Sequence, residues 1–264
     1  TTADKIFFGG MSSHYNVPIN DFDPEGKFPR EDRYFVTDKH STEMYADAAV
    51  NFLNNYRDDR PFFMYVSFQS PHDPRHMPQK YLEMYDPDNL PLPKNFLPAH
   101  PFDFGEANHR DEKLERWPRT PEKIRRHIAD YYGFITYTDA EIGRILEALK
   151  EIGQYDNTII IFAGDNGLAV GRHGLMGKQN IYDHSVHIPL VMSGPVIPSG
   201  ERSSALCYLL DIFPTLCDLT GLPVPVTVEG KSLAPVIRRE KLKTWDSLFF
   251  AFKNFQRGVR TERW

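Results

Sequence analysis

Apolar side chains recur at helical spacing in two stretches of the chain, which predicts two amphipathic helices. The first stripe has Asp38 and Ser41 as candidate caps. Its members are Tyr45, Ala48, Ala49, Phe52, Leu53 and Tyr56. The second helix should begin at Thr120 and Pro121, a capping hydroxyl followed by proline at the first helical position, and should end at Gly153. Its stripe consists of Ile124, Ile128, Tyr131, Ile135, Thr138, Ile142, Ile145 and Leu149.

Three short apolar runs have the length and composition of strands buried on both faces. They are Pro61–Phe68, Thr158–Ala163 and Ile188–Met192. Because long helices separate strands here, and parallel neighbours need crossover connections, we expect an α/β fold with a largely parallel sheet flanked by helices. Ligands of such sheets bind at the carboxyl ends of the strands.

The segment from Pro87 to Pro118 carries six prolines and little periodicity. We therefore predict a long loop or insertion on the surface, of the kind that is usually functional or disordered.

Composition and charge narrow the function classes. The 264 residues are 41% apolar and 25% charged, as in a globular protein with a substantial core. The 31 Lys and Arg against 36 Asp and Glu give a net charge of −5, which argues against a dedicated nucleic-acid binder. No apolar run approaches the roughly 20 residues that a membrane-spanning helix needs.

Hard oxygen donors follow the second predicted strand. Asp165 and Asn166, between two glycines, offer a carboxylate and an amide oxygen that suit Ca²⁺ or Mg²⁺. An ordinary Asp-Asn turn explains the same residues. The glycine-rich stretch that follows could bring His173 and Lys178 back toward the same strand end. Two oxygen donors plus a cation fit a metal-bound oxyanion.

Histidines form a second group of candidates. His72 follows the first predicted strand in a loop that Pro71 and Pro74 stiffen, so its imidazole could point at a ligand. A solvated loop residue is the alternative. His184, and with it His187, is a further possible substrate contact.

The ordered combination of these segments resembles the formylglycine-dependent sulfatases, from about residue 35 onward. The resemblance rests on Ser-Pro-His72-Asp-Pro, Thr138-Asp-Ala-Glu-Ile-Gly-Arg, Ala-Gly-Asp165-Asn166-Gly and Gly-Arg-His173-Gly-Leu-Met-Gly-Lys178. Val-His-Ile-Pro-Leu-Val, Asp211-Ile-Phe-Pro-Thr-Leu and Val228-Glu-Gly-Lys-Ser-Leu extend it.

This resemblance implies an alkaline-phosphatase-like α/β fold and carries roles onto four residues. Asp165 and Asn166 would bind the active-site Ca²⁺, and Lys178 would contact the sulfate. His72 would contact the sulfate or the ester oxygen and could protonate the leaving group. His173 and His184 are expected to help bind the substrate.

Two departures from the family pattern are clear. Neither Cys207 nor Cys217 stands in the Cys/Ser-x-Pro/Ala-x-Arg motif that yields the formylglycine nucleophile, and no serine version occurs. The family's first pair of metal-binding aspartates and its amino-terminal Lys and His are absent too. We therefore expect residues 1–240 to be a partial catalytic domain that lacks its amino-terminal part, and 241–264 to begin a small carboxyl-terminal subdomain.

The resulting hypothesis is a sulfuric ester hydrolase whose intact parent acts on a sulfated carbohydrate or small molecule. This chain alone, without the formylglycine nucleophile, should be inactive. A metal-dependent phosphoesterase of the same superfamily and a non-catalytic binding module are the alternatives. Family habit suggests export, to a compartment that these residues leave open.

Overall fold

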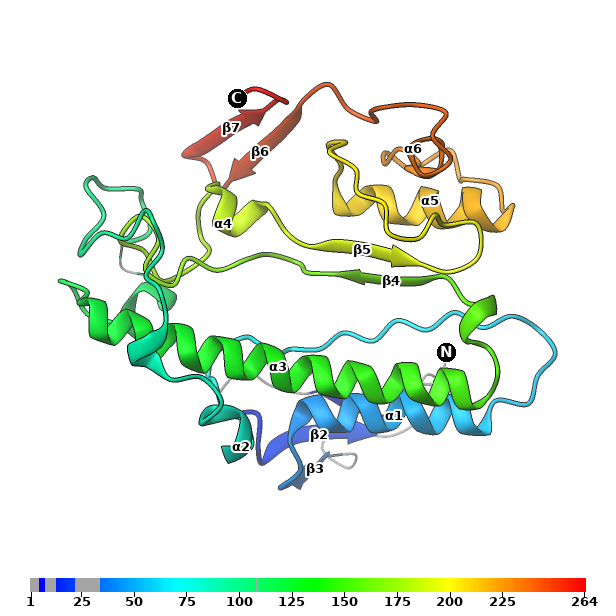
Figure 1. Ribbon diagram of the computed structural model, residues 1–264, viewed down its shortest axis with the longest axis horizontal. Helices are drawn as coiled ribbons and strands as arrows, with labels where there is room; N and C mark the ends of the chain where they lie inside the picture. The colour runs from blue at the N-terminus through cyan, green and yellow to red at the C-terminus, as the bar shows by residue number, and fades with distance from the viewer. Residues whose placement is uncertain (1–4, 8–12, 22–33, 108) are drawn as a thin grey trace. The chain divides into compact units, whose positions relative to one another are not determined.

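The computed structural model describes residues 5–7, 13–21, 34–107 and 109–264 of the chain (Figure 1). The chain divides into two compact units. The first comprises Thr1–Leu92 and Thr120–Asp156, and the second comprises Pro93–Arg119 and Asn157–Trp264.

The described part of the first unit contains a small sheet, two long helices and three short ones. Its elements are β1 (Lys5–Phe7), β2 (Val17–Asp21), β3 (Tyr34–Thr37), α1 (Ser41–Asn55), α2 (Gln79–Leu82), the 3-10 helix η2 (Pro87–Asn89), α3 (Pro121–Glu151) and the 3-10 helix η4 (Tyr155–Asn157, whose last residue belongs to the second unit). Strands β1, β2 and β3 pair in that order, and both pairings are antiparallel.

The second unit contains two strand pairs and several short helices. Its elements are the 3-10 helix η3 (Asp111–Leu114), β4 (Ile160–Ala163), α4 (Asp183–Val186), β5 (Leu190–Ser193), the 3-10 helix η5 (Leu209–Asp211), α5 (Ile212–Thr220), α6 (Ala234–Ile237), β6 (Leu248–Phe252) and β7 (Gln256–Arg260). Strand β4 pairs with β5, and β6 with β7.

Helix α1 confirms the first helix prediction, but the predicted caps are wrong. The cap is His40, whose ring Nδ1 accepts the backbone N–H of Thr42 at 3.1 Å. Ser41 is the first helical residue instead. A buried imidazole nitrogen can satisfy an exposed N–H of the first turn as a hydroxyl or carboxylate does, which the usual cap preferences do not anticipate.

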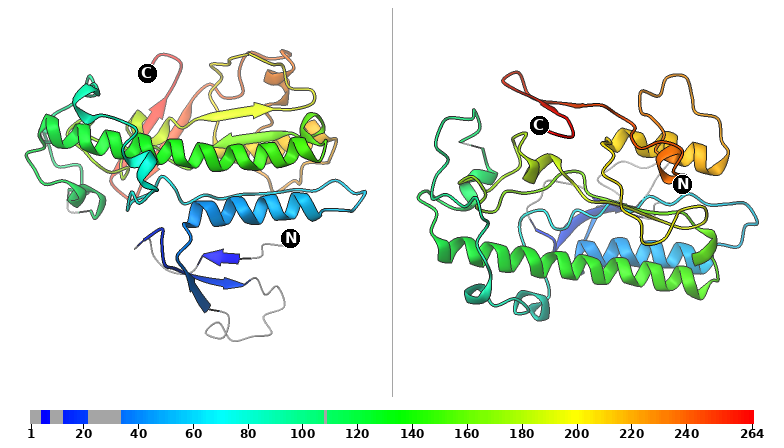
Figure 2. Two further views of the ribbon diagram at one scale, coloured as in Figure 1. Left: turned by 60° about the horizontal axis from the view of Figure 1, so that its bottom comes forward. Right: turned by 45° about the horizontal axis from the view of Figure 1, so that its top comes forward.

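Helix α3 confirms the second helix prediction at both ends. Thr120 Oγ1 accepts the backbone N–H of Lys123, and Gly153, with a left-handed φ of 71°, donates its N–H to the carbonyl of Lys150. Helices α1 and α3 lie side by side in both figures (Figures 1 and 2). Four residues of this unit form a buried apolar cluster: Met77, Tyr81, Phe134 and Tyr137.

The first predicted strand is wrong. Pro61–Phe68 is extended, with side chains alternately exposed and half-buried, but it belongs to no strand. Phe63 and Tyr65 are 77% and 81% exposed. An apolar β-branched and aromatic run indicates an extended backbone, whereas a strand also requires a hydrogen-bonded neighbour that the run itself does not specify.

The second and third predicted strands exist as β4 and β5, but their expected burial on both faces is wrong. Phe162 and Val191 are 46% and 59% exposed. Every strand pair that the structure describes is antiparallel, so the largely parallel sheet stays a prediction. The predicted loop from Pro87 to Pro118 is confirmed, since η2 and η3 are the only helices among its described residues. The predicted boundary at residue 240 also stays a prediction.

Within the described ranges, no helix combines the length and the apolar character that crossing a bilayer would require.

Candidate active site

The loop that carries His72 belongs to the first unit and folds tightly on itself. The backbone N–H of His72 donates to the carbonyl of Gln69 at 2.9 Å. Its ring Nδ1 lies 2.8 Å from the carbonyl oxygen of Asp73, so Nδ1 carries a proton and donates it. The Asp73 carboxylate pairs with Arg75 at 3.0 Å. The orientation of the His72 ring is therefore set by its own loop.

Two fully buried histidines form hydrogen bonds with the backbone of this loop. His14 and His40 are 0% and 1% exposed, and their rings stack with centroids 5.0 Å apart. Nε2 of His14 lies 3.0 Å from the carbonyl oxygen of His72, and Nε2 of His40 lies 2.9 Å from that of His76. The two imidazoles thus anchor both ends of the segment from His72 to His76.

Both buried rings are neutral at ordinary pH. A carbonyl oxygen only accepts, so each Nε2 bears the proton, and the Nδ1 of His40 accepts from Thr42. Burial lowers the pKa of His14, and burial lowers that of His40 to about 4. Sequence reasoning missed this pair, because a lone histidine beside no motif carries no signal of its partner.

Asp165 and Asn166 directly follow β4, as predicted. Asp165 is exposed, and its Oδ1 accepts the backbone N–H of Asn166 at 2.8 Å. Gly167 donates its N–H to the carbonyl of Ser185 at 2.9 Å. A Cβ on Gly167 would lie 2.0 Å from the carbonyl oxygen of His184, so only glycine allows this approach. The turn is thereby fixed against the segment that carries His184.

A tight hairpin leads from this turn to Lys178. The N–H of Ala169 donates to the carbonyl of Gly177 at 3.0 Å, and that of Gly171 to Leu175 at 2.7 Å. Gly171 and His173 have left-handed φ angles of 92° and 55°. The glycine-rich stretch therefore folds back on itself, and the convergence of His173 and Lys178 on the end of β4 stays a prediction.

A buried ion pair inside the Pro87–Pro118 region and its flank supports this hairpin. Glu112 and Arg119 are 3% and 1% exposed, and their charged groups meet at 2.6 Å. Glu112 also accepts the backbone N–H groups of Gly177 at 2.8 Å and Met176 at 3.0 Å. Arg119 donates to the carbonyl of Gly174. Two charged side chains thus hold three of the four residues before Lys178, namely Gly174, Met176 and Gly177.

A second acidic side chain lies near Lys178. Burial alone would raise the pKa of Asp111, but hydrogen bonds from Gln179 and Arg110 and the charge of Lys178 outweigh it and lower that pKa. Asp111 Oδ2 accepts from Gln179 Nε2 at 2.8 Å. The region around Lys178 therefore carries a stable negative charge as well as its ammonium.

His173 and His184 lie together, as the substrate-binding prediction requires. His173 stacks on Tyr182 with ring centroids 4.4 Å apart, and the ring centroids of His173 and His184 lie 5.9 Å apart. Burial, followed by the neighbouring His173, lowers the pKa of His184 to about 3. Neither ring nitrogen of His184 has a hydrogen-bond partner among the described residues. These two rings are neutral and suit hydrogen bonding to a ligand.

The second unit thus holds five of the six candidates, and the first unit holds His72. A cavity shared by His72, Lys178, Asp165 and Asn166 stays a prediction. The donor set of Asp165 and Asn166, two oxygens, fits a hard cation such as Ca²⁺ in kind. Among the described residues, no three His, Cys, Asp or Glu side chains gather where they could hold a metal ion.

Comparison with known proteins gives a consistent result. The family model described as "Sulfatase" matches residues 4–222. An arylsulfatase of Clostridium perfringens (strain 13 / Type A) is 33% identical over 210 residues, which are 78% of this chain and 43% of that protein. The chain spans about half the length of the curated relatives it matches.

Superposition on solved structures indicates the fold of the chain. A structure in complex with its substrate D-glucosamine-2-N,6-O-disulfate superposes with a TM-score of 0.79 at 22% identity, over 97% of this chain and 65% of the other. A phosphonate monoester hydrolase from Silicibacter pomeroyi superposes with a TM-score of 0.65 at 31% identity, over 78% of this chain and 43% of the other. These neighbours support the alkaline-phosphatase-like fold.

Proposed function

The chain belongs to the sulfatase family, and from this membership we propose that it is the carboxyl-side part of the catalytic domain of a sulfuric ester hydrolase. One observation carries the proposal. The family match over residues 4–222 includes all six candidate residues.

In this proposal His72 is the general acid. A sulfate ester departs with negative charge on its bridging oxygen, so a proton delivered there lowers the barrier. The Nδ1 of His72 donates to the carbonyl of Asp73, which assigns the acid role to Nε2. The loop's internal bonds and the His14 anchor support this role, because a general acid must be held in one orientation.

In this proposal the ammonium group of Lys178 binds the non-bridging sulfate oxygens. The ion pair of Glu112 and Arg119 positions the residues before it, so its ammonium is presented by a rigid hairpin. His173 and His184, both neutral, would donate or accept hydrogen bonds at the rest of the substrate. A cation fixed in advance stabilises the developing charge without reorganising at the moment of reaction.

Asp165 and Asn166 would contribute two oxygen ligands to a metal ion. Sulfatases generally use a metal ion; for this chain we propose Ca²⁺. When bound, it supplies positive charge next to the sulfate oxygens. Gly167 supports this assignment, since its close approach to His184 fixes the turn that presents both ligands.

The nucleophile is proposed to be a formylglycine that a residue outside this chain provides. Cys207 and Cys217 are followed by Tyr-Leu-Leu and Asp-Leu-Thr, which do not fit the formylglycine motif. Sulfated carbohydrate is the proposed substrate class. The neighbour solved with a glucosamine disulfate is consistent with that class, although its 22% identity speaks for the fold alone.

A phosphoesterase of the same superfamily is the second candidate, because a phosphonate monoester hydrolase is 31% identical over 78% of this chain. The two reactions share oxygen ligands and cations and differ in the central atom and the nucleophile.

One experiment tests the proposal. The coding sequence upstream should be read, and the longer protein it encodes should be assayed with 4-nitrophenyl sulfate, N-acetylglucosamine-6-sulfate and a phenyl phosphonate monoester. We expect a Cys/Ser-x-Pro/Ala-x-Arg motif upstream, turnover of both sulfates, and no turnover by the 264-residue chain alone. Faster hydrolysis of the phosphonate, or turnover by the chain alone, would overturn it.

A further inference from the structure

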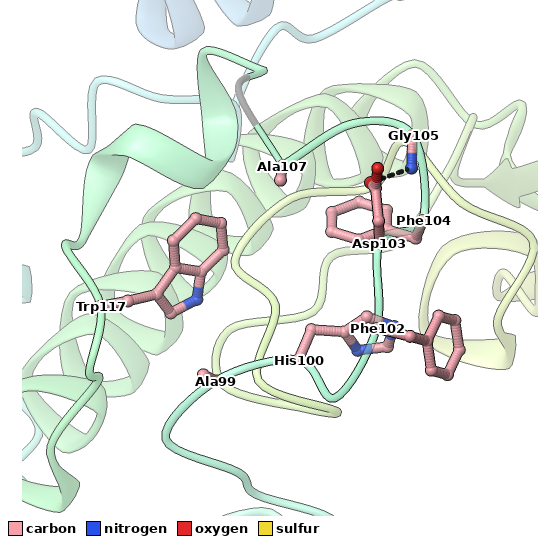
Figure 3. A pocket seen from close by; sticks show the side chains of 8 residues that line it. All are labelled: Ala99, His100, Phe102, Asp103, Phe104, Gly105, Ala107 and Trp117. Atoms are coloured by element: carbon pink, nitrogen blue, oxygen red, sulfur yellow. Dashed lines mark hydrogen bonds between the residues drawn. The ribbon is translucent and has the colours of Figure 1, made fainter.

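An aromatic pocket lies within the second unit, in the segment between Ala99 and Trp117. Figure 3 shows its lining residues, which are Ala99, His100, Phe102, Asp103, Phe104, Gly105, Ala107 and Trp117. Its volume is about 490 Å³, within the range of small-ligand sites. Three of these side chains are the large aromatic rings of Phe102, Phe104 and Trp117, and none of the eight is a lysine or an arginine. None of the six candidate site residues lines this pocket.

The walls of the pocket are held by the hairpin that leads to Lys178. Trp117 donates its indole N–H to the carbonyl of Gly174 at 3.2 Å, and the guanidinium carbon of Arg119 lies 4.5 Å from the Trp117 ring centroid. His100 Nδ1 lies 2.7 Å from the carbonyl oxygen of His173. Because these rings are fixed before a ligand arrives, little freedom is lost when one binds.

The other side of the pocket is held by the β6–β7 hairpin. Gln256 Nε2 donates to the carbonyl of Phe104 at 3.0 Å. A Cβ on Gly105 would lie 2.6 Å from the Phe255 ring, so the glycine lets that ring pack closely. Lys253 pairs with the buried Glu106. The segment Phe104–Glu106 on this side of the pocket is thus supported from within the same unit.

The polar groups of the pocket are hydrogen-bond acceptors. Asp103 is exposed, and one of its oxygens, Oδ1, accepts the N–H of Gly105 at 2.8 Å (Figure 3). His100 donates from Nδ1 to the carbonyl of His173, and its other ring nitrogen, Nε2, is a buried atom with no hydrogen-bond partner among the described residues. A donor from a ligand that reaches it would satisfy it. The pocket therefore suits a ligand rich in hydroxyl donors.

Charge and shape exclude the sulfate group itself as the occupant. The Asp103 carboxylate would repel an anion, and the lining offers no lysine or arginine to offset it. Phe102, at 61% exposure, and Trp117, at 40%, present flat apolar surface next to these acceptors. A sugar ring has such a combination, with C–H groups on one face and hydroxyl donors around its rim.

The pocket also adjoins the candidate substrate-binding residues of its own unit. The His100 ring lies 5.9 Å from that of Tyr182, which stacks on His173 at 4.4 Å. His184 completes this group. A ligand in the pocket would therefore extend toward the side chains that the proposed function assigns to the substrate.

We propose that this pocket binds an unsulfated, hydroxyl-bearing sugar ring of the substrate, with Trp117 against its C–H face, Phe102 at its edge beyond His100 (Figure 3) and Asp103 accepting its hydroxyls. The inference rests on the proposed function for the identity of the substrate, but the pocket itself is testable without catalysis.

Calorimetric titration of the 264-residue chain with the unsulfated disaccharide N,N′-diacetylchitobiose tests it. We expect saturable binding that Phe102→Ala weakens by about 3- to 10-fold, as loss of an aromatic contact does. Asp103→Ala should weaken it by about 10-fold. The matched control is Phe213→Ala, since Phe213 in α5 is 53% exposed and lies outside the pocket, and it should bind like the wild type. Thermal unfolding midpoints of the three variants equal to that of the wild type would show that a loss of binding does not come from misfolding.

Three outcomes would overturn the inference: no binding by the wild-type chain, an affinity in Phe102→Ala and Asp103→Ala equal to that of the wild type, or displacement of the disaccharide by inorganic sulfate. Failure of the proposed function looks different. In that case the longer protein hydrolyses no sulfate ester while the chain still binds the disaccharide.

Discussion

The loops that carry His72 and Lys178 are held in place by opposite means. The His72 loop is held by two neutral imidazoles, His14 and His40, which donate to the carbonyls of His72 and His76. The hairpin before Lys178 is held by a buried ion pair, in which Glu112 accepts two backbone N–H groups and Arg119 donates to the carbonyl of Gly174.

This difference follows from which backbone groups each loop leaves unpaired. The His72 loop exposes carbonyls to its support and needs donors, which neutral imidazoles supply without adding charge near a general acid. The hairpin before Lys178 exposes N–H groups and needs an acceptor. A carboxylate accepts two of them, but when buried it requires a cation, and Arg119 provides it. The two supports should therefore fail under different perturbations.

The largest effect is expected from Glu112→Gln. The amide can still accept from Met176 and Gly177, but Arg119 is left as a buried charge without its partner. Breaking such a pair typically costs about 3–5 kcal/mol. Urea unfolding at neutral pH should show this loss of stability.

Glu147→Gln is the control, because its pair with Lys150 is exposed and removal should leave the urea midpoint unchanged. A Glu112→Gln variant as stable as the Glu147→Gln variant would mean that the ion pair does not support the hairpin.

The first loop should instead respond to acid. The pKa of His40 is about 4 in the folded protein against 6.5 for an ordinary histidine, so its stabilising contribution is complete above pH 6.5 and is lost as pH falls toward 4. The difference corresponds to about 3 kcal/mol at low pH. His14 acts in the same direction, and the groups whose charges act on this pair are His72, His76 and Asp73.

Unfolding free energy measured from pH 7 to pH 4 in the wild type and in His40→Asn isolates this term. The variant should lose less stability over that range, since it has no ring to protonate. Identical pH profiles would show that His40 is not neutral and buried as described.

A smaller effect is expected from His40→Asn at neutral pH. Asparagine can keep the cap of α1, but it loses the Nε2 donation to His76, which should cost about 1–2 kcal/mol. His40→Ala should cost about 1 kcal/mol more, because the cap is lost as well. His187→Asn, at an exposed histidine, should not change the midpoint. Equal costs for the Asn and Ala variants would contradict a capping role.

The smallest effect is expected from Ca²⁺. Asp165 and Asn166 supply two oxygen ligands, whereas Ca²⁺ takes about six to eight, so binding by this chain should be weak and its melting temperature nearly unchanged by the ion. Titration calorimetry checks this. Micromolar binding that Asp165→Ala abolishes would mean a more complete ligand set than these two residues.

The two long helices and the turn at Asp165 and Asn166 could be predicted from the sequence. The side chains that hold the His72 loop and the hairpin before Lys178 could not. Thr120 and Gly153 mark the ends of α3 because their own backbone chemistry begins and ends helices. Asp165 and Asn166 follow β4 for a similarly local reason. By contrast, His14 acts on a loop 58 positions away, and Glu112 on residues 64 and 65 positions away. No local pattern reports such partners.

Strand prediction shows the same limit. The run from Pro61 to Phe68 predicted a strand that the structure does not contain, because strand formation depends on a hydrogen-bonded neighbour elsewhere in the chain. His173 and His184 could be selected by their motifs, but the stacking of His173 on Tyr182, the proximity of His184 to both rings and the neutral state of His184 required coordinates.

The central claim is that His72 protonates the leaving group of a sulfate ester whose sulfate Lys178 binds. It is tested most directly by the dependence of kcat/KM on leaving-group pKa, measured with a series of aryl sulfates for the longer protein and its His72→Ala and Lys178→Ala variants. We predict a shallow slope for the wild type and for Lys178→Ala, which should be uniformly slower, and a steep slope for His72→Ala, because poor leaving groups then depart unprotonated. A His72→Ala slope equal to that of the wild type would contradict the account.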